Sequence, residues 1–208
     1  AGLIGSNFVR FLLDTDSQAY IVNLDRLTYA GSRENLEDLR GNVRHVFIKG
    51  DICDPVLVRK ILDAHEIDVI VNFAAETYVD RSIEDPSGFV RTNITGTFNL
   101  LECAREYWLG RYEQRRFHQI STDEVYGDLD QDATSCTESA PYRPSSPYAA
   151  SKASADHLVR AYFRTYGFPA TISVSSNNYG PYQFPEKIVP LAILNALLGK
   201  PIPIYGNG

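Results

Sequence analysis

Short apolar runs alternate with longer stretches of helical periodicity along the chain. Five runs rich in Val, Ile and other apolar residues have the length and composition of buried parallel strands. They cover residues 20–24, 43–48, 69–74, 117–121 and 170–174. Strands that alternate with helices at this spacing are typical of βαβ units, in which a parallel sheet is joined by right-handed crossovers. The predicted fold class is therefore α/β, with a doubly wound parallel sheet.

Helix start and stop signals fall between these runs. The apolar residues of segment 8–13 recur on one helical face. An Asp-Pro pair at 54–55 supplies an N-cap followed by Pro at the first helical position. A second Asp-Pro pair, at 85–86, predicts the start of a long helix that ends at Tyr107. A further helix is predicted over residues 147–166, with Gly167 as its C-terminal stop.

Two segments depart from the alternation. Residues 128–147 are polar and rich in Pro and Ser, which predicts a surface loop. Residues 177–190 hold three prolines and two tyrosines and are too irregular for a strand. We therefore expect one domain over residues 1–175 and the start of a second lobe over residues 176–208.

Composition excludes several classes of protein. With 44% hydrophobic and 22% charged residues among 208, the chain has the profile of a globular protein with a real core. A net charge of -6 disfavours nucleic acid as a partner. No apolar run approaches the ~18 residues of a membrane span. The three scattered cysteines, Cys53, Cys103 and Cys136, suit reduced thiols in the cytoplasm, and without a CxxC or HExxH motif no metal site is predicted.

The first residues carry a possible dinucleotide-binding signal. Gly2 and Gly5 stand directly before a predicted helix, where glycines let the backbone approach a pyrophosphate at the helix N-terminus. Asp25 follows at the end of the next predicted strand, in the position of an acid that binds ribose hydroxyls and favours NAD over NADP. Arg26 weakens that preference, since NADP sites often recruit an Arg. Glycines before a helix are also common in simple turns.

Two further strand ends support the same interpretation. Residues 50–52 (GDI) and 72–75 (NFAA) each close a predicted strand. Ligands of open α/β sheets bind beyond the carboxyl ends of the strands. Each segment alone would be an ordinary loop, but together they predict a Rossmann-like NAD-binding domain.

A second group of residues points to chemistry. Tyr148 and Lys152 stand four apart on a predicted helix, hence on one face, and an ammonium beside a phenol favours the phenolate needed for a base. This spacing is also frequent on ordinary amphipathic helices. The sequence Thr122-Asp123-Glu124 follows a buried strand, where two carboxylates are costly unless they are solvated or used. They form either an exposed acidic turn or a matched acid and base.

Together these motifs resemble the extended short-chain dehydrogenase/reductase family, in its branch of NAD-dependent nucleotide-sugar epimerases and dehydratases. The resemblance spans nearly the whole chain. Its motifs are AGLIGSNFVR, VNLDRLTYAG, KGDICD, NFAAETYVDRSI, RTNITGTFNLLE, STDEVYG, SPYAASKA, SNNYGPYQFPEK and KPIPIYGNG.

The resemblance implies a 4,6-dehydration of a nucleotide sugar, with dTDP-glucose as the expected substrate. NAD would remove hydride from the sugar C4 and return it to C6. Tyr148 would take the C4 hydroxyl proton, Glu124 the C5 proton, and Asp123 would protonate the departing C6 hydroxyl. An acid and a base held side by side push their pKa values apart, as this chemistry needs.

The resemblance also implies the site residues. Thr122, Asp123, Glu124, Tyr148 and Lys152 would be catalytic. The residues expected to contact NAD are Gly2, Leu3, Ile4, Gly5, Asp25, Arg26, Leu27, Thr28, Asp51, Ile52, Ala74, Ala75, Thr92, Tyr148, Lys152 and Asn178. Those expected to contact the nucleotide sugar are Thr77, Thr122, Asn177, Lys187, Ile188, Pro203, Ile204 and Tyr205. A homodimer through a four-helix interface is also implied.

Some positions depart from the family pattern. A further glycine usually precedes Gly2 by three residues and here would lie before the chain start, so the first strand and most of the second lobe are expected to be missing. Arg26 stands where Lys is usual, and Thr77-Tyr78 where Ser-His is commoner. The alternatives are a nucleotide-sugar 4-epimerase or decarboxylase, for which no Asp-Glu pair is expected, a non-catalytic NAD sensor, and a structural interaction module.

Overall fold

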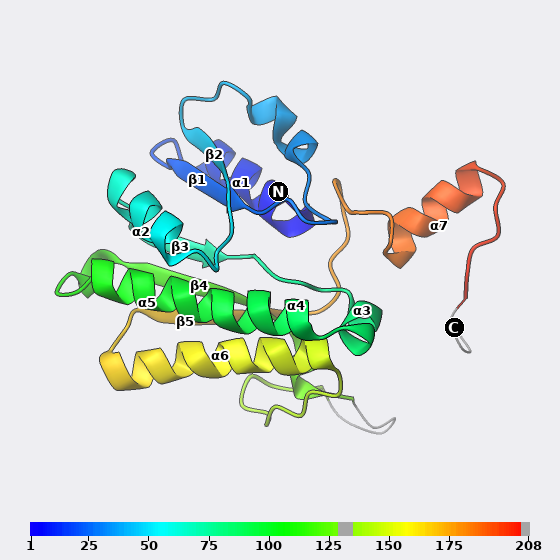
Figure 1. Cartoon of the computed structure of the whole chain (residues 1–208). Helices are drawn as coiled ribbons and strands as arrows, with labels where there is room; N and C mark the ends of the chain where they lie inside the picture. The colour runs from blue at the N-terminus through cyan, green and yellow to red at the C-terminus, as the bar shows by residue number, and fades with distance from the viewer. Residues whose placement is uncertain (129–134, 205–208) are drawn as a thin grey trace. The chain divides into compact units, whose positions relative to one another are not determined.

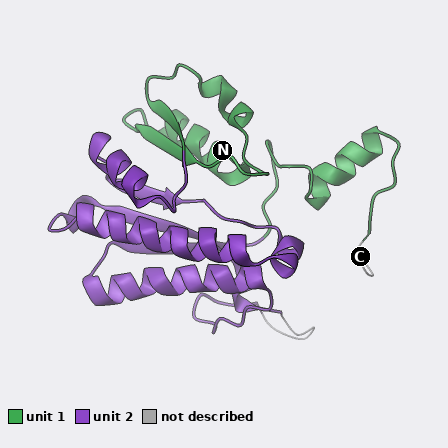
Figure 2. Ribbon diagram, in the orientation of Figure 1, with its two compact units in different colours: residues 1–49, 177–208 green, residues 50–176 purple. Residues whose placement is uncertain are grey.

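The computed structural model describes residues 1–128 and 135–204. The chain forms two compact units, one made of residues 1–49 and 177–208 and the other of residues 50–176 (Figure 2). Every strand pair is parallel, so the predicted α/β class is confirmed. Among the described residues, no helix is long and apolar enough to cross a membrane.

The first unit contains a two-stranded sheet and its helices. Its elements are α1 (Leu3–Thr15), β1 (Ile21–Asp25), the 3-10 helix η1 (Arg33–Leu39), β2 (His45–Lys49) and α7 (Ile188–Leu197). β1 pairs with β2 from Ile21 opposite His45 to Asp25 opposite Lys49. On the predicted face of α1, Val9 and Leu13 are buried. Helix α7 was not predicted, because its ten mostly apolar residues show no amphipathic period.

The second unit contains the strands β3 (Val69–Asn72), β4 (Arg116–Thr122) and β5 (Ala170–Ser175) in that order across the sheet. Its helices are α2 (Pro55–Ala64), α3 (Val79–Glu84), α4 (Ser87–Phe89), the π-helix η2 (Val90–Gly96), α5 (Thr97–Tyr107), η3 (Tyr112–Gln114), η4 (Asp123–Tyr126) and α6 (Pro147–Tyr166). Helices α5 and α6 run side by side, and α6 packs on β4 and β5 (Figure 1).

An aromatic cluster forms the core of this unit. The rings of Trp108 and Phe168 stack with centroids 5.7 Å apart, and Phe117 packs against Phe168 at 6.0 Å. All three side chains are fully buried, and the Trp108 indole donates a hydrogen bond to the Ile67 carbonyl at 2.8 Å. The three buried rings anchor the C-terminal ends of α5 and α6 to the sheet, and the one polar atom among them, the indole nitrogen, has a hydrogen-bond partner.

Two of the three predicted helix signals are confirmed, whereas the helix predicted from Asp85-Pro86 begins at Ser87 with Pro86, not Asp85, as its N-cap. Asp54 accepts hydrogen bonds from the first turn of α2, and Gly167 ends α6 in the left-handed conformation at φ +62°. The long helix predicted to end at Tyr107 is a continuous helical run, but its middle is the π-helix η2. At the end of η2 a Cβ on Gly96 would lie 2.5 Å from Ile52 Cδ1, so the absence of a side chain lets the helix approach the loop after β2.

Candidate active site

Helix α6 carries Tyr148 and Lys152 on one buried face. Ser146 caps the helix by accepting the Ala149 N–H at 3.0 Å. The backbone N–H of Tyr148 donates to Ser82 Oγ at 3.2 Å, so the first turn is also held by α3. Tyr148 is 7% exposed and Lys152 5%. The predicted pairing on a single helical face is therefore confirmed, and both side chains face inward.

Lys152 reaches from α6 to the adjacent strand. Its Nζ donates a hydrogen bond to the Ile120 carbonyl oxygen of β4 at 2.6 Å. Burial lowers the pKa of Lys152 to about 8, and the negative charge of Asp156 opposes that shift. The ammonium is thus fixed one helical turn from the Tyr148 phenol, where a positive charge favours the phenolate form.

The strand β4 ends in the predicted acidic turn. Thr122 caps η4 through its Oγ1, which accepts the Glu124 N–H at 3.4 Å and donates to Asp123 Oδ1 at 3.3 Å. Asp123 is exposed and Glu124 is half-buried. Helix α6 packs against this turn, so the structure brings the helix that carries Tyr148 and Lys152 and the acidic turn together within the second unit.

The segment before α6 lies against the acidic turn. Gly127 has φ +82°, and a Cβ there would collide with the Arg143 carbonyl. The Arg143 N–H donates to the Val125 carbonyl at 2.9 Å, and the Tyr126 and Tyr142 rings meet edge to face at 5.3 Å. The described ends of the predicted surface loop are therefore fixed to the turn that carries the carboxylates. Residues 129–134 of that loop lie outside the described residues.

The loop after β2 holds Asp51 in a fixed orientation. Its Oδ1 accepts the Cys53 N–H at 2.9 Å, and its Oδ2 pairs with Arg91 Nη2 at 2.8 Å. Burial opposes ionisation of Asp51, but the bonds from Cys53 and Arg91 outweigh it and hold the pKa below its usual value. Ile52 is buried, and its carbonyl accepts a bond from Asn99. The predicted cofactor residues here are rigidly placed.

The loop after β3 is held by buried amides. Asn72 Oδ1 accepts the Ala74 N–H at 3.2 Å. Asn93, 1% exposed on η2, accepts the Glu76 N–H at 2.9 Å and donates to the Glu76 carbonyl at 3.0 Å and to Ser151 Oγ at 2.8 Å. The same stretches carry the predicted site residues Ala74, Ala75, Thr77 and Thr92, all half-buried.

In the first unit, the glycine segment lies at the start of α1 as predicted. Gly2 is the N-cap and has no side-chain capping bond, so the N–H groups of Leu3, Ile4 and Gly5 open the helix. Asp25 ends β1, and its Oδ1 accepts the Leu27 backbone N–H at 2.7 Å.

These features fit a dinucleotide. A helix N-terminus without a side-chain cap can bind an anionic phosphate, and a carboxylate at the adjacent strand end can bind ribose hydroxyls. A Cβ on Gly31 would lie 3.1 Å from Asp25 Oδ1, so a residue without a side chain leaves that carboxylate room. Beside Asp25, Leu27 is half-buried with φ +58°, while Arg26 and Thr28 are exposed.

The structure brings Leu3, Ile4 and Asn178 together. They line one hollow of the first unit, together with Asn7, Phe8, Phe11 and residues 179–181. Asn7 Nδ2 bonds the Pro181 carbonyl at 3.0 Å, which ties α1 to this segment. Asn177 and Ile188 are exposed and Lys187 is half-buried. Pro203 is half-buried, Ile204 is exposed, and Tyr205 lies outside the described residues.

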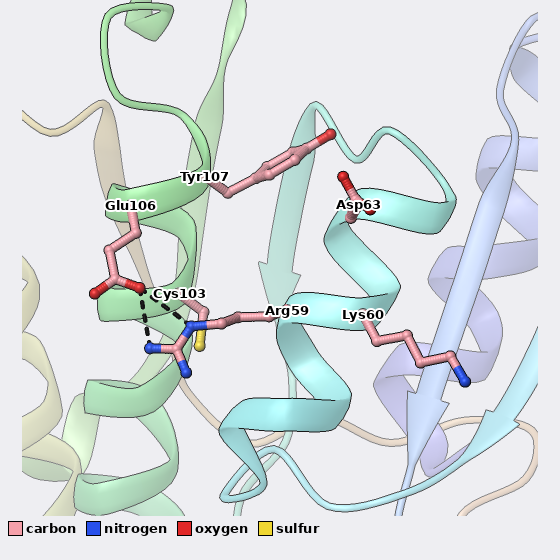
Figure 3. A pocket seen from close by; sticks show the side chains of 6 residues that line it. All are labelled: Arg59, Lys60, Asp63, Cys103, Glu106 and Tyr107. Carbon is pink, nitrogen blue, oxygen red and sulfur yellow. Dashed lines mark hydrogen bonds and ion pairs between the residues drawn. The ribbon is translucent and has the colours of Figure 1, made fainter.

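A separate hollow on the second unit contains none of the predicted residues. Figure 3 shows its lining, which comes from α2 and α5 and consists of Arg59, Lys60, Asp63, Cys103, Glu106 and Tyr107. Arg59 Nη2 pairs with Glu106 at 2.9 Å across it. Among the residues that the structure describes, no group of three or more His, Cys, Asp and Glu side chains could hold a metal ion.

Sequence reasoning missed the buried polar side chains that position these residues. They are Asn72, Ser82, Asn93, Ser121, Ser151 and Asp156, all below 5% exposed. Asp156 could have been found, since it continues the spacing of Tyr148 and Lys152 by four residues on the same helical face. The others depend on contacts between distant segments.

The parallel strands and their covering helices define a Rossmann-like α/β protein. The chain belongs to the protein family described as GDP-mannose 4,6 dehydratase, whose model matches residues 1–208. This confirms the resemblance to nucleotide-sugar dehydratases that the motifs indicated.

Individual relatives agree with this assignment. The chain is 54% identical over 212 residues to a dTDP-glucose 4,6-dehydratase from Neisseria meningitidis serogroup B, covering 100% of this chain and 59% of the relative. The crystal structure of DesIV, a dTDP-glucose 4,6-dehydratase from Streptomyces venezuelae with NAD and TYD bound, matches with TM-score 0.91 and 48% identity, covering 100% of this chain and 63% of that one.

A relative with a different activity is also similar. A UDP-glucuronic acid 4-epimerase from Bacillus cereus, in complex with UDP-glucuronic acid and NAD, matches with TM-score 0.89 and 31% identity over 100% of this chain and 64% of that chain. The chain thus spans about three fifths of the length of the relatives it matches.

Proposed function

We propose that the protein carrying this sequence is an NAD-dependent nucleotide-sugar 4,6-dehydratase that converts dTDP-glucose to dTDP-4-keto-6-deoxyglucose, a hydro-lyase reaction. The observation that carries the proposal is that α6, which buries Tyr148 and Lys152 on one face, packs against the turn that presents Asp123 and Glu124. The Tyr148–Lys152 pair suits oxidation of an alcohol, and the Asp123–Glu124 pair suits loss of water. The similarity to named dTDP-glucose 4,6-dehydratases supports the substrate.

NAD is the proposed cofactor. When bound, it would accept a hydride from the sugar C4 and give it back at C6. In the first unit the proposed contacts are Gly2, Leu3, Ile4, Gly5, Asp25, Arg26, Leu27, Thr28 and Asn178. In the second unit they are Asp51, Ile52, Ala74, Ala75, Thr92, Tyr148 and Lys152. The uncapped start of α1 and the Asp25 carboxylate support the phosphate and ribose contacts.

Tyr148 is the proposed base for the C4 hydroxyl. A phenol has an ordinary pKa near 10 and is a weak base at neutral pH, so it needs a positive neighbour. The Lys152 ammonium supplies that charge one turn away, and its bond to the Ile120 carbonyl prevents it from turning away. Tyr148 therefore takes the hydroxyl proton while Lys152 stabilises the phenolate.

Asp123 and Glu124 are the proposed acid and base of the dehydration. Once C4 is a ketone, the C5 proton is acidic and Glu124 removes it. Asp123 donates a proton to the C6 hydroxyl, which leaves as water, and when the hydride returns to C6 a proton is delivered to C5. Thr122 is proposed to orient the acid and to contact the sugar, and its hydrogen bond to Asp123 Oδ1 supports the first of these roles.

The remaining substrate contacts are also proposals. Residues 1–175 form the NAD-binding domain and residues 176–208 the start of the nucleotide-sugar lobe, with contacts from Thr77, Asn177, Lys187, Ile188, Pro203, Ile204 and Tyr205. The exposed apolar surface of α7 supports a larger lobe in the full-length protein, since none of its residues is buried by the described part of the chain although it is almost wholly apolar.

We also propose a homodimer with a four-helix interface formed by the helical run that ends at Tyr107 and by α6. Exposed apolar side chains on these helices support the interface. They are Val90 and Phe98 on the run that ends at Tyr107, and Phe163 and Tyr166 on α6. Analytical ultracentrifugation should show a dimer that Phe98→Glu weakens. A cytoplasmic location is proposed from the odd number and wide scatter of the three cysteines, Cys53, Cys103 and Cys136, which is not the pattern of a disulfide framework.

The test is a substrate panel with the full-length protein that carries this sequence. We expect dTDP-glucose to give a 4-keto product, revealed by its absorbance in alkali, at a higher kcat/KM than UDP-glucose or GDP-mannose. Mass spectrometry should show loss of one water. A 4-epimer without loss of water would instead establish the epimerase alternative, and NAD binding with no product would establish the sensor.

A further inference from the structure

One fully buried carboxylate lies beside the proposed machinery and takes no part in the chemistry described so far. Asp156 is 0% exposed and lies one turn beyond Lys152 on α6. Tyr148, Lys152 and Asp156 therefore share one face of the helix, at successive intervals of four residues. A buried charge costs several kcal/mol unless polar partners surround it.

The partners of Asp156 come from the strand and from the segment before α6. Its Oδ2 accepts the Ser121 hydroxyl at 2.5 Å and the Tyr142 hydroxyl at 3.0 Å. Arg160 Nη2 donates to the Tyr142 oxygen at 2.9 Å. Oδ1 is buried and has no hydrogen-bond partner among the described residues. The carboxylate is thus an acceptor for two hydroxyls, with Lys152 and Arg160 as the charged groups around it.

Two side chains of α6 hold consecutive residues of β4. Lys152 binds the Ile120 carbonyl at 2.6 Å, and one turn later Asp156 binds the Ser121 hydroxyl. The next residue of the chain is Thr122, whose hydroxyl caps the turn that carries the proposed acid and base. A shift of Ser121 would therefore move the acidic turn relative to Tyr148.

We propose that Asp156 is a positioning residue: its carboxylate fixes the end of β4 through Ser121 and is the negative partner of Lys152 on the same face of α6. The kinetic part of this inference rests on the proposed function. Burial opposes ionisation and raises the pKa of Asp156, whereas Ser121, Lys152, Tyr142 and Arg160 oppose that change.

The kinetic test compares Asp156→Asn with Asp63→Asn in the full-length protein. Asn keeps the size and an acceptor oxygen, whereas the charge is lost. We expect kcat to fall roughly tenfold or more, equivalent to about 1.4 kcal/mol, with KM changed less than about twofold. Asp63 is an exposed residue of α2 outside the site, so the matched control should leave both constants unchanged.

The pH profile separates positioning from a merely structural role. Removing the negative charge disfavours the Lys152 ammonium, so Lys152 loses its proton at lower pH. The alkaline limb of kcat should move down by roughly one pH unit in Asp156→Asn. Ser121→Ala removes one hydrogen bond but no charge, and should lower kcat without moving that limb. An unchanged limb in Asp156→Asn, or an unchanged kcat, would overturn the proposal.

A direct titration keeps the inference independent of the reaction. NMR of lysine labelled with ¹³C at Cε, with Lys152→Arg used to assign the signal, should show Lys152 titrating at lower pH in Asp156→Asn than in the parent protein. Equal titration midpoints contradict the proposal even if the parent protein makes no keto sugar. If Asp156→Asn does not fold, Ser121→Ala tests the proposal instead. An unaltered kcat in Ser121→Ala would show that the bond between Asp156 and Ser121 does not position the end of β4, and would overturn the proposal.

Discussion

Two stretches of the second unit differ sharply although α6 packs directly against the turn. Tyr148, Lys152 and Asp156 on α6 are almost inaccessible, and the Tyr148 backbone N–H, Lys152 Nζ and Asp156 Oδ2 are each hydrogen-bonded to a neighbouring element. The turn Asp123–Tyr126 is a short 3-10 helix whose first carboxylate is exposed and whose cap bonds are 3.3 and 3.4 Å long.

The difference corresponds to the two kinds of chemistry in the proposed function. Oxidation at C4 needs a phenol made basic by a charge held nearby, and burial keeps that charge close and unscreened. Dehydration needs carboxyl groups that exchange protons with a substrate and with water, so they must remain accessible. Mutations in the buried helix are thus expected to reduce the oxidation step, and mutations in the exposed turn are expected to reduce the dehydration step.

The largest effect should come from the helix. Tyr148→Phe removes the proposed base and keeps the ring that packs against Phe89, with centroids 6.3 Å apart in the parent protein. We expect kcat to fall about 10³-fold, within the usual range for loss of a general base. Steady-state kinetics of the full-length protein measure this, and an unchanged thermal midpoint shows that the fold is intact. A fall below tenfold would remove Tyr148 from the proposed role.

The next effect tests what keeps α6 rigid. Phe168 follows the C-cap of α6 and packs on Trp108, Phe117 and Tyr162. Phe168→Ala should lower the free energy of unfolding by about 3–5 kcal/mol, because it empties a fully buried site. Leu109 is 70% exposed, so Leu109→Ala should change it by less than about 0.5 kcal/mol. Urea denaturation measures both, and equal effects would show that the cluster does not support the helix.

The smallest effect concerns the first turn of α6. Ser146→Ala removes the bond to the Ala149 N–H and should cost about 1 kcal/mol of stability. Ser146→Asp, which restores an N-cap acceptor, should recover most of it. Activity should change little in either variant, since the Ser82 and Ile120 bonds still hold α6. A large loss of kcat in Ser146→Ala would mean that the helix is less rigid than its burial indicates.

The elements predicted from the sequence were those with local signals. The Asp-Pro start of α2, the left-handed Gly167 and the apolar runs of the five strands depend on residues close together in the chain. The Tyr148–Lys152 spacing belongs to the same class. The π-helix η2 was not predicted, because helical spacing alone does not show an extra residue in a turn.

The polar support of the site could not be predicted in the same way. Asp156 meets Ser121, 35 residues away, and Asn93 meets Ser151, 58 residues away. Such pairs are fixed by the packing of α6 on β4 and η2, and a single sequence does not reveal which buried polar groups become partners. Hydroxyl and amide side chains on helices are also common without any such role.

The most direct test of the division between helix and turn uses Asp123→Asn in the full-length protein. The reaction with dTDP-glucose is quenched early and reduced with sodium borodeuteride, which labels any carbonyl carbon. We predict hexose that still has its C6 hydroxyl and carries deuterium at C4, because Tyr148 still supports oxidation while water loss is slowed about 10²-fold or more. Tyr148→Phe, as the matched control, should give neither label nor dehydrated product. Unchanged formation of the keto-deoxysugar in Asp123→Asn, or no label at C4, would contradict the account.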